Sequence, residues 1–431
     1  MYHKVVLYTQ ANRRIKGTMP INSTFRVDCK ENGMKTAQAL SCHGLKRKHA
    51  FAPLFLACIA MGTVWLASLP KIAMAMEQSN AGQAKPAFNQ VSLAKFEEPW
   101  ALAVLPDGRF LITEKAGMLY LFNVEKQTKT PVANVPKVDY GGQGGLGDVI
   151  PAPDFTTSRS LYLSYVEAGK GNTRGAKVIK AILDESQAKP RLSELTDIWT
   201  QAPKVSGHGH YSHRLLFSPD KEFLFISSGD RQKFDPAQDM AGNLGKIIRL
   251  RPDGTAPADN PFYKQGAPAN QVWSLGHRNV LGMQFDASGN LWAHEMGPRG
   301  GDELNLILPG KNYGWPVVSN GRHYSGIDIP DHATRPDFTP PEITWTPVIS
   351  PSSMTIYNGS IFPAWQGKGL FSGLSSKALM VVDFGDDKRR PEELYRYELG
   401  TRIRNVSATA DGRVYLLEDG KGGKLLRLDP K

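Results

Sequence analysis

Two short blocks of this chain hold the side chains best suited to bind an anionic cofactor and a metal ion. The first is Gly276-His277-Arg278-Asn279, and the second spans 294–305, where the adjacent carboxylates of Asp302 and Glu303 follow a stretch rich in Gly and Pro. Guanidinium and amide groups bind carboxylate and carbonyl oxygens, and oxygen-rich loops bind calcium. The two blocks therefore predict a site for a polyanion beside a hard cation.

Three histidines, His208, His210 and His213, lie close together in the sequence. This density is compatible with a zinc site, although no cysteine or suitably spaced carboxylate accompanies it. Two other interpretations stay open from the residues alone. The histidines could be ordinary loop residues, or one could be a general base, because imidazole titrates near neutral pH.

Two further segments are ambiguous by themselves. Residues 141–147 are rich in glycine but lack the Lys and Ser/Thr of a phosphate loop, so a flexible loop explains them as well. In Arg402-Ile403-Arg404 the two guanidinium groups are two residues apart, which places them on one face of a strand. They could bind one ligand together or form an ordinary solvated strand face.

The order and residue content of these blocks resemble the soluble, periplasmic aldose sugar dehydrogenases that use pyrroloquinoline quinone (PQQ) and calcium. The resemblance covers about residues 92–430, and its most specific parts are 276–279 and 297–307. It implies an enzyme that oxidises aldose sugars at the anomeric carbon to lactones, by hydride transfer to PQQ with calcium. Electrons would then pass to an external acceptor, and broad aldose specificity is expected.

The resemblance also implies individual roles. His210 matches the general base of the family, and Asp230 matches the carboxylate that orients this base. The carbonyls of Gly297 and Pro298 would hold the calcium ion beside the cofactor. Glu303 and the carbonyl of Tyr313 would hold a further one. The positions that match cofactor contacts are Gln143, Arg278, Asn279, Tyr324, Leu374, Ser375, Ser376, Arg402, Ile403 and Arg404.

Two positions depart from the family. His213 stands where relatives have a small residue. Many relatives also place a lysine near the end of the strand expected at 370–376, where this chain has Ser376 followed by Lys377. A one-residue slip in a strand reverses the side on which a side chain lies. Either Lys377 reaches the cofactor through a bulge, or residues 374–376 make the contact without a cation.

A turn followed by a short alternating strand recurs six times and supplies the frame for these side chains. Each copy has Asp with Gly or Pro in or beside the turn, or a Pro-containing turn, and alternating apolar residues after it, a pattern typical of half-buried strands joined by tight turns. The copies lie at 105–113, 153–164, 218–226, 286–292, 362–371 and 410–417. They predict an all-β, six-bladed β-propeller over 93–431, with long loops on the cofactor face. A large β-sandwich or two β domains is the alternative.

The net charge of +11 is concentrated in the first 75 residues. These hold 11 of the 52 lysines and arginines but only two of the 41 acidic residues, so residues 76–431 are nearly neutral. A binding surface for nucleic acid would require a cationic mature domain. The composition therefore argues against nucleic-acid binding.

Residues 1–75 are interpreted as an N-terminal extension followed by a secretory signal peptide. The basic residues 46–48 precede the apolar run 50–69, and Ala73-Met74-Ala75 forms a cleavage site. An uncleaved membrane anchor is the alternative. After cleavage we expect a periplasmic monomer without stable membrane insertion, with a flexible tether at 76–92. It would contain no cysteine, because all three precede the cut.

Two other functions fit the same fold. A calcium-dependent propeller lactonase, or another hydrolase, would share the calcium and the histidine. A neutral lactone, however, needs no pocket lined by Arg278, Arg402 and Arg404. A propeller that only binds carbohydrate or a protein partner would turn over neither a sugar nor a lactone.

Overall fold

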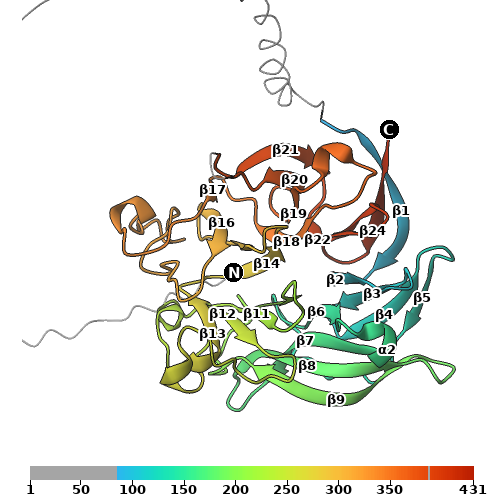
Figure 1. The fold of residues 1–431 in the computed structure, drawn as a ribbon, viewed down its shortest axis with the longest axis horizontal. Coiled ribbons are helices and arrows are strands. Elements are labelled where there is room, and N and C mark those ends of the chain that lie inside the picture. Colours follow the sequence, from blue (N-terminus) through green and yellow to red (C-terminus); the bar gives the residue numbers. More distant parts are fainter. Residues whose placement is uncertain (1–84, 387–388) are drawn as a thin grey trace, which may run out of the picture. The chain divides into compact units, whose positions relative to one another are not determined.

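The computed structural model describes residues 85–386 and 389–431. It consists of six four-stranded sheets, and the first strands of neighbouring sheets contact one another in a closed ring (Figure 1). The chain is therefore a six-bladed β-propeller, as the six sequence repeats predict. The signal peptide predicted at 1–75 lies outside the described residues.

Five blades are formed by consecutive strands, and the sixth combines both ends of the propeller. Blade 1 contains β2 (Pro99–Val104), β3 (Phe110–Glu114), β4 (Met118–Asn123) and β5 (Thr128–Pro131); blade 2 contains β6 (Leu146–Pro151), β7 (Ser160–Ala168), β8 (Arg174–Asp184) and β9 (Arg191–Thr200). Blade 3 contains β10 (Ser212–Phe217), β11 (Leu224–Ser228), β12 (Lys246–Leu250) and β13 (Val272–Leu275); blade 4 contains β14 (Val280–Phe285), β15 (Leu291–Glu295), β16 (Asp302–Ile307) and β17 (Ile343–Trp345). Blade 5 contains β18 (Pro351–Ile356), β19 (Gly369–Gly373), β20 (Ala378–Asp383) and β21 (Glu392–Glu398); blade 6 contains β22 (Ile403–Ala408), β23 (Val414–Glu418), β24 (Gly423–Pro430) and β1 (Phe88–Phe96).

Each repeat seen in the sequence marks the connection from the first to the second strand of one blade. In blade 4, for example, Gly289 N donates to Asp286 O at 3.0 Å, which closes the turn. The Asp286 carboxylate also accepts from the amides of Ser288 and Asn290 at 2.9 Å. Asp and Gly recur at these places because the carboxylate caps the turn and glycine adopts positive φ.

The ring is closed by antiparallel pairing of β1 with β24, from Phe88 opposite Pro430 to Phe96 opposite Gly423 (Figure 1). This corrects part of the expected tether at 76–92, since residues 88–92 belong to a strand. The outer position of β1 explains its polar sequence, whereas Leu93 and Phe96 reach the core of the neighbouring blade. Pairing the two ends leaves no open seam between the first and last blades.

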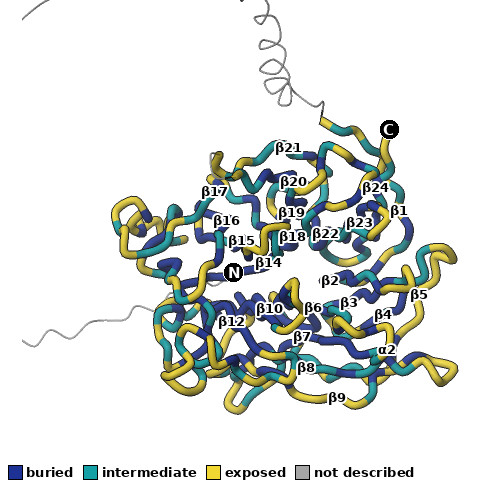
Figure 2. Tube along the Cα trace, viewed as in Figure 1, coloured by how far each residue is buried: buried dark blue, intermediate teal, exposed yellow. Residues whose placement is uncertain are grey.

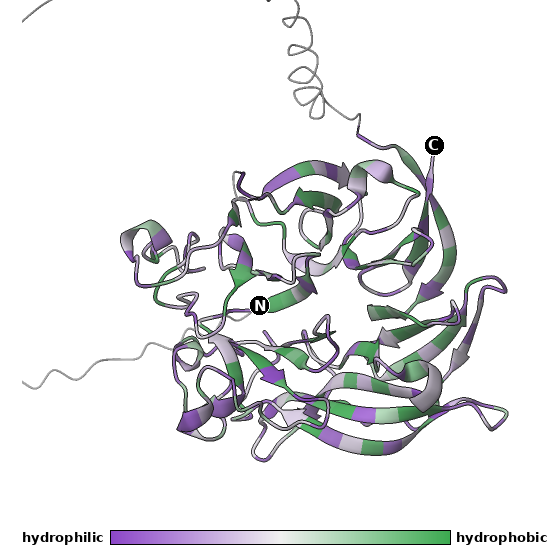
Figure 3. Cartoon of the chain, in the orientation of Figure 1, coloured by the Kyte–Doolittle hydropathy of each residue, from purple (hydrophilic) through white to green (hydrophobic). Residues whose placement is uncertain are grey.

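Helical structure is minor in the described part of the chain. The only α-helix there is α2 (Phe155–Ser158), and the 3-10 turns are Asp235–Ala237, Tyr263–Gln265, Ala269–Gln271, His332–Thr334 and Pro363–Trp365. Apolar side chains of neighbouring blades pack together in the core. The inner strands are buried while β5 and much of β9 are exposed (Figure 2), and the hydropathy of each residue is mapped on the chain in Figure 3. Among the described residues, none of the helices has the length and apolar character needed to span a membrane.

One buried cation connects the inner strands. Arg214, in β10, donates to the carbonyls of Leu281 at 2.7 Å and Ser352 at 3.1 Å. It also pairs with Asp148 at 3.3 Å, and its guanidinium carbon lies 3.8 Å from the ring centroid of Trp100. These partners belong to four other blades, so Arg214 holds five of the six together beneath the site described next.

Candidate active site

The predicted site residues come mostly from segments that lead into the first strands of different blades. Gln143 precedes β6, His210 precedes β10, Arg278 and Asn279 precede β14, and Arg402 precedes β22. The connection between β16 and β17 adds Tyr324. Residues far apart in the sequence therefore converge at one face of the propeller, because each blade contributes one such segment.

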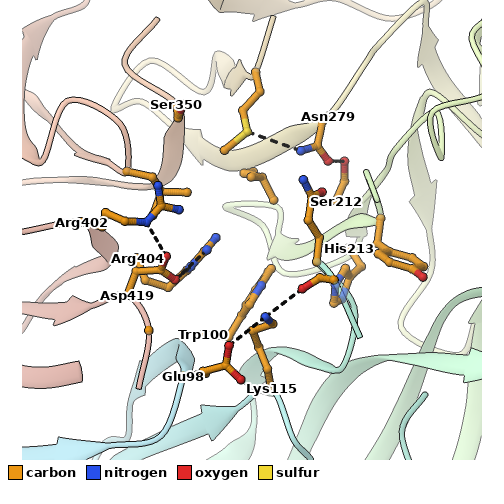
Figure 4. Close-up of a pocket in the computed structure, with 17 residues that line it drawn as sticks. Glu98, Trp100, Lys115, Ser212, His213, Asn279, Ser350, Arg402, Arg404 and Asp419 are labelled. Carbon is orange, nitrogen blue, oxygen red and sulfur yellow. Dashed lines mark hydrogen bonds and ion pairs between the residues drawn. The ribbon is translucent and has the colours of Figure 1, made fainter. Parts of the chain in front are cut away.

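These residues line two adjoining cavities. The smaller has a volume of about 360 Å³, and its lining includes Asn279, Leu374, Arg402 and Arg404 (Figure 4). The larger has a volume of about 700 Å³ and is lined by, among others, His210, Arg278, Gly297, Pro298 and Tyr324. Gln143, Met296 and Ser350 border both. The volumes are typical of sites for small organic ligands.

His210 and Asp230 form a buried pair. The Nδ1 atom of His210 donates to Asp230 Oδ1 at 2.7 Å, and the other carboxylate oxygen accepts from the indole of Trp315 at 2.7 Å. The backbone amide of His210 donates to the side-chain oxygen of Gln143 at 2.7 Å. Among the described residues Nε2 of His210 has no hydrogen-bond partner, so the tautomer fixed by Asp230 leaves this atom as an acceptor at the cavity wall.

The electrostatic surroundings keep His210 neutral. Burial lowers the pKa of His210, the hydrogen bond to Asp230 opposes this shift, and the nearby charge of Arg278 lowers the pKa further. An imidazole that is neutral at pH 7 and oriented by a carboxylate has the properties of a general base.

The two other histidines occupy separate environments. His208 is exposed, whereas His213 is buried, stacks on Trp100 with 4.9 Å between ring centroids, and lies 2.8 Å from Ser164 Oγ. Burial lowers the pKa of His213 to about 3. In the described part of the chain the three histidines thus do not share one site, and no group of three or more His, Cys, Asp or Glu side chains suited to a metal occurs there.

Arg278 is buried beside His210, and one of its terminal nitrogens is hydrogen-bonded to backbone oxygens. One terminal nitrogen donates to the carbonyls of Met296 at 3.0 Å and Gly297 at 2.7 Å, while Nε is buried without a partner in the described structure. The guanidinium carbon lies 5.1 Å from the Trp315 ring and 6.0 Å from the exposed ring of Tyr324. Arg278 is thus a fixed cation with an unsatisfied donor.

Arg402, just before β22, and Arg404, within it, both reach one carboxylate. Nε of Arg402 lies 2.8 Å from Asp419, and two nitrogens of Arg404 lie 2.9 and 2.7 Å from it. Burial raises the pKa of Asp419, but the two guanidinium groups outweigh this effect and hold the pKa below its usual value. The pair of arginines therefore presents net positive charge to the smaller cavity.

The predicted calcium ligands fall into two places. Gly297 and Pro298 border the larger cavity, and the amide of Gly297 donates to Asp302 at 2.8 Å. Glu303 and Tyr313 are buried. Burial and the neighbouring charge of Glu295 raise the pKa of Glu303 well above its usual value. The amide nitrogen of Asn305 donates to Glu303 at 3.2 Å, while its oxygen is buried without a partner in the described structure.

Some predicted cofactor contacts do not line either cavity. Ser375 donates to the Val348 carbonyl at 3.1 Å, and Ser376 lies near Met380 Sδ at 3.7 Å. The side chain of Ile403 is fully buried in the apolar core. β19 ends at Gly373, so Ser376 and Lys377 follow the strand and neither lines the cavities.

Several lining residues carried no motif in the sequence. Trp100 and Lys115 belong to this group, Met296 lies within the block 294–305 but has no predicted role there, and the indole of Trp315 donates to Asp230. Trp100 lies in β2 and Lys115 directly follows β3, both ordinary strands of blade 1, so only the closure of the ring brings them to the site. Trp315 lies in the segment 311–316 around Tyr313. Its indole is the one sequence feature that could have identified it as a site residue.

The sequence pattern of the Glucose / Sorbosone dehydrogenase family matches residues 96–427. The aldose sugar dehydrogenase YliI of Escherichia coli K12 is 38% identical over 341 residues, which cover 78% of this chain and 91% of that protein. A crystal structure of the soluble E. coli aldose sugar dehydrogenase in its apo form has a TM-score of 0.74 at 36% identity, and covers 80% of this chain and 100% of that one. The PQQ-bound aldose sugar dehydrogenase of Streptomyces coelicolor has a TM-score of 0.67 at 27% identity, over 81% and 100%.

Proposed function

The chain belongs to the glucose/sorbosone dehydrogenase family, and on that premise we propose that it oxidises aldose sugars at the anomeric carbon with PQQ and calcium, as a periplasmic monomer that passes electrons to an external acceptor. One observation carries the proposal: the His210–Asp230 pair lies in the wall of a cavity that adjoins a second, cationic one. The names of similar proteins support the substrate class and the quinone.

The residues around the cavities fit a polyanionic quinone. Nε of Arg278 is a buried donor without a partner in the described structure, and the amide nitrogen of Asn279 reaches only a sulfur atom, Met296 Sδ, at 3.7 Å. Arg402 and Arg404 add guanidinium groups, which pair well with carboxylates. Gln143, Arg278, Asn279, Arg402 and Arg404 would hold the cofactor, which when bound supplies a two-electron acceptor.

The protein supplies the base and its orientation. Because Nδ1 of His210 donates to Asp230, Nε2 is the atom that accepts the proton of the anomeric hydroxyl. The imidazolium that forms is stabilised by the Asp230 carboxylate, which Trp315 holds in place. Burial lowers the pKa of His210, and the charge of Arg278 beside this pair lowers it further, so the base is neutral before the reaction.

Calcium fits the chain in two ways. A carbonyl oxygen has two lone pairs, so Gly297 can accept the hydrogen bond of Arg278 and still face a cation together with Pro298. At the second place, the Glu303 carboxylate and the oxygen of Asn305, which has no partner among the described residues, would be hard ligands in a buried, acidic environment. The carbonyl of Tyr313 accepts from His332 at 3.1 Å and has the same spare capacity.

The decisive experiment is reconstitution. Purified protein is mixed with PQQ and Ca²⁺, glucose and a redox dye are added, and dye reduction is compared with the His210→Ala variant. We expect PQQ-dependent dye reduction by the wild type and a large loss in the variant. Absence of dye reduction with any of a panel of aldoses would reject the dehydrogenase, and hydrolysis of lactones without PQQ would favour a hydrolase.

A further inference from the structure

We propose that Lys115 is a further cofactor-binding residue, whose ammonium group binds a carboxylate of the anionic quinone. The proposal rests on the function proposed above and deepens it. Lys115 directly follows β3 in blade 1, and its side chain lines the smaller cavity. Figure 4 shows it beside Glu98 and Trp100, around the same cavity as Arg402 and Arg404.

The charges around this cavity make Lys115 decisive. The ionised side chains in its lining are three cations, Lys115, Arg402 and Arg404, and two carboxylates, Glu98 and Asp419. His213 also lines the cavity, but it is neutral because its pKa is about 3. The net charge of the lining is therefore +1. Without Lys115 it would be zero, and an anionic ligand would lose the excess positive charge that attracts it.

The ammonium group of Lys115 has a free donor. Its Nζ donates to the Gly142 carbonyl at 2.9 Å and lies 3.4 Å from Glu98 Oε1. The second distance is long for a charge-assisted hydrogen bond, which usually measures about 2.7–2.9 Å. An ammonium group has three N–H donors, and the third has no acceptor among the described residues. Lys115 is therefore held in place without being saturated.

Glu98 is also engaged from its other side. The phenol of Tyr140 donates to Glu98 Oε2, and this hydrogen bond is the largest cause of the lowered pKa of Glu98. Glu98 thus remains an anion that steadies the ammonium group of Lys115 and does not take its proton. The two residues form a weak ion pair that a carboxylate of the ligand can extend.

The main chain of Lys115 is held by the glycine-rich segment 141–147. Its carbonyl accepts from the Leu146 amide at 2.9 Å, so the glycine-rich segment 141–147 packs directly on it. Gly145 has a φ of +144°, and a Cβ atom at this position would collide with that carbonyl. Lys115 and Gln143, which both border the cavity, therefore belong to segments that pack directly against each other.

The test compares two ligands with one change of residue. Apo protein is titrated with PQQ and with its trimethyl ester, which lacks the carboxylate charges, and quenching of tryptophan fluorescence reports binding. We expect Lys115→Met to weaken PQQ binding about tenfold to a hundredfold, as loss of a charge-assisted hydrogen bond should. Binding of the ester should change less than about threefold, and Lys115→Arg should restore much of the PQQ affinity.

The matched control is Lys421→Met. Lys421 is exposed and close enough to influence Glu98, but it does not line the cavity, so removing its equal charge should leave PQQ affinity within about twofold. Melting curves and circular dichroism confirm that each variant is folded, and Lys115→Gln provides a second variant that keeps a donor to Gly142.

The outcomes separate the two proposals. If wild-type protein binds PQQ and Lys115→Met binds it equally well, the assignment of Lys115 is wrong while the proposed function stands. If Lys115→Met and Lys115→Gln both lose PQQ and the ester to the same extent, Lys115 acts only through the glycine-rich segment, which also overturns the assignment. If the wild type binds no PQQ, the proposed function itself fails.

Discussion

His210, which leads into β10, and Asp230, which follows β11, are joined by a 2.7 Å hydrogen bond. His210 precedes β10 with a φ of +49°, and Arg231 and Gln232, which follow Asp230, have φ values of +56° and +58°. L-residues rarely adopt such values, and backbone strain of this kind clusters at functional sites. The fold thus tolerates local backbone strain, and this strained backbone brings the histidine and the carboxylate together.

Replacing the histidine tests its role as a base. We expect His210→Ala to lower kcat by about 10²- to 10⁴-fold, because this is the usual contribution of general base catalysis. PQQ affinity should stay within a fewfold, since the guanidinium groups that hold the cofactor are unchanged. Steady-state kinetics and a fluorescence titration measure the two quantities, and an equal loss of both would assign His210 to cofactor binding instead.

The pH dependence should follow the lowered pKa of His210. The base acts when neutral, so kcat/KM should rise with pH through the pKa of His210 and be constant above it. Because burial lowers this pKa from the usual value for histidine of about 6.5, the acidic limb should lie below pH 6.5. A limb centred above this value in the kcat/KM profile would show that His210 is not the group that titrates.

Asp230→Asn should alter both the rate and this profile. The hydrogen bond to Asp230 opposes the effect of burial, so its weakening should move the acidic limb to lower pH than in the wild type. The neutral amide of the variant also no longer stabilises the imidazolium of His210 electrostatically. We therefore expect kcat to fall about 10²-fold or more. A variant with reduced kcat and an unmoved acidic limb would contradict the pairing of the two residues.

The fold could be predicted from sequence because its signals are local. The Asp-Gly turns at 105–113 and 410–417 each specify a hairpin within a few residues, and the six repeats of turn and strand give the number of blades. β1 escaped prediction, since its pairing with β24 joins opposite ends of the domain and leaves a polar, edge-like pattern. Such long-range pairing has no local sequence signal.

The site could be predicted only where a motif names a residue. Arg278 and His210 stand in recognisable runs, and they border one cavity. Lys115 has no motif, because its relation to Arg404 exists only across the closed ring. The sequence places Ser376 in a strand, but β19 ends at Gly373 and Lys377 has a φ of +51°. The alternation of side chains in a strand therefore does not predict which way Ser376 and Lys377 point.

Removing the arginines should weaken cofactor binding in a manner that depends on salt. We expect Arg404→Met to reduce PQQ affinity about tenfold or more in dilute buffer, with a smaller difference at high ionic strength. Asp419→Asn should have the opposite effect, because it frees both guanidinium groups from a competing carboxylate. Fluorescence titrations at two salt concentrations measure these changes, and tighter PQQ binding by the arginine variant would exclude a cationic cofactor site.

Chelation should reveal the calcium expected at Glu303. Ca²⁺ that binds only the folded protein adds about 2.7 kcal/mol when its concentration is 100 times Kd. We therefore expect the melting temperature of the apo protein to rise with Ca²⁺ and to return with a chelator. Glu303→Gln should reduce the rise in melting temperature with Ca²⁺. It should not lower the melting temperature in the chelator, because the strongly raised pKa of the buried carboxyl means that a neutral amide replaces a group that is already easily protonated. An identical calcium response in the variant would reject Glu303 as a ligand.

The ion pair of Asp148 and Arg214, at the centre of the ring, should contribute more to the free energy of unfolding than to the catalytic rate. Asp148 and Arg214 are both buried, and burial raises the pKa of Asp148 against the opposing charge of Arg214. Arg214→Met leaves a buried carboxylate without its partner, a change that typically costs about 3–5 kcal/mol. The double variant Asp148→Asn, Arg214→Met removes both charges and should recover part of this loss. Urea unfolding of the wild type, the two single variants and the double variant measures the coupling free energy between the two side chains. Strictly additive losses would show that the two side chains stabilise the ring independently, through contacts such as that of Arg214 with Trp100.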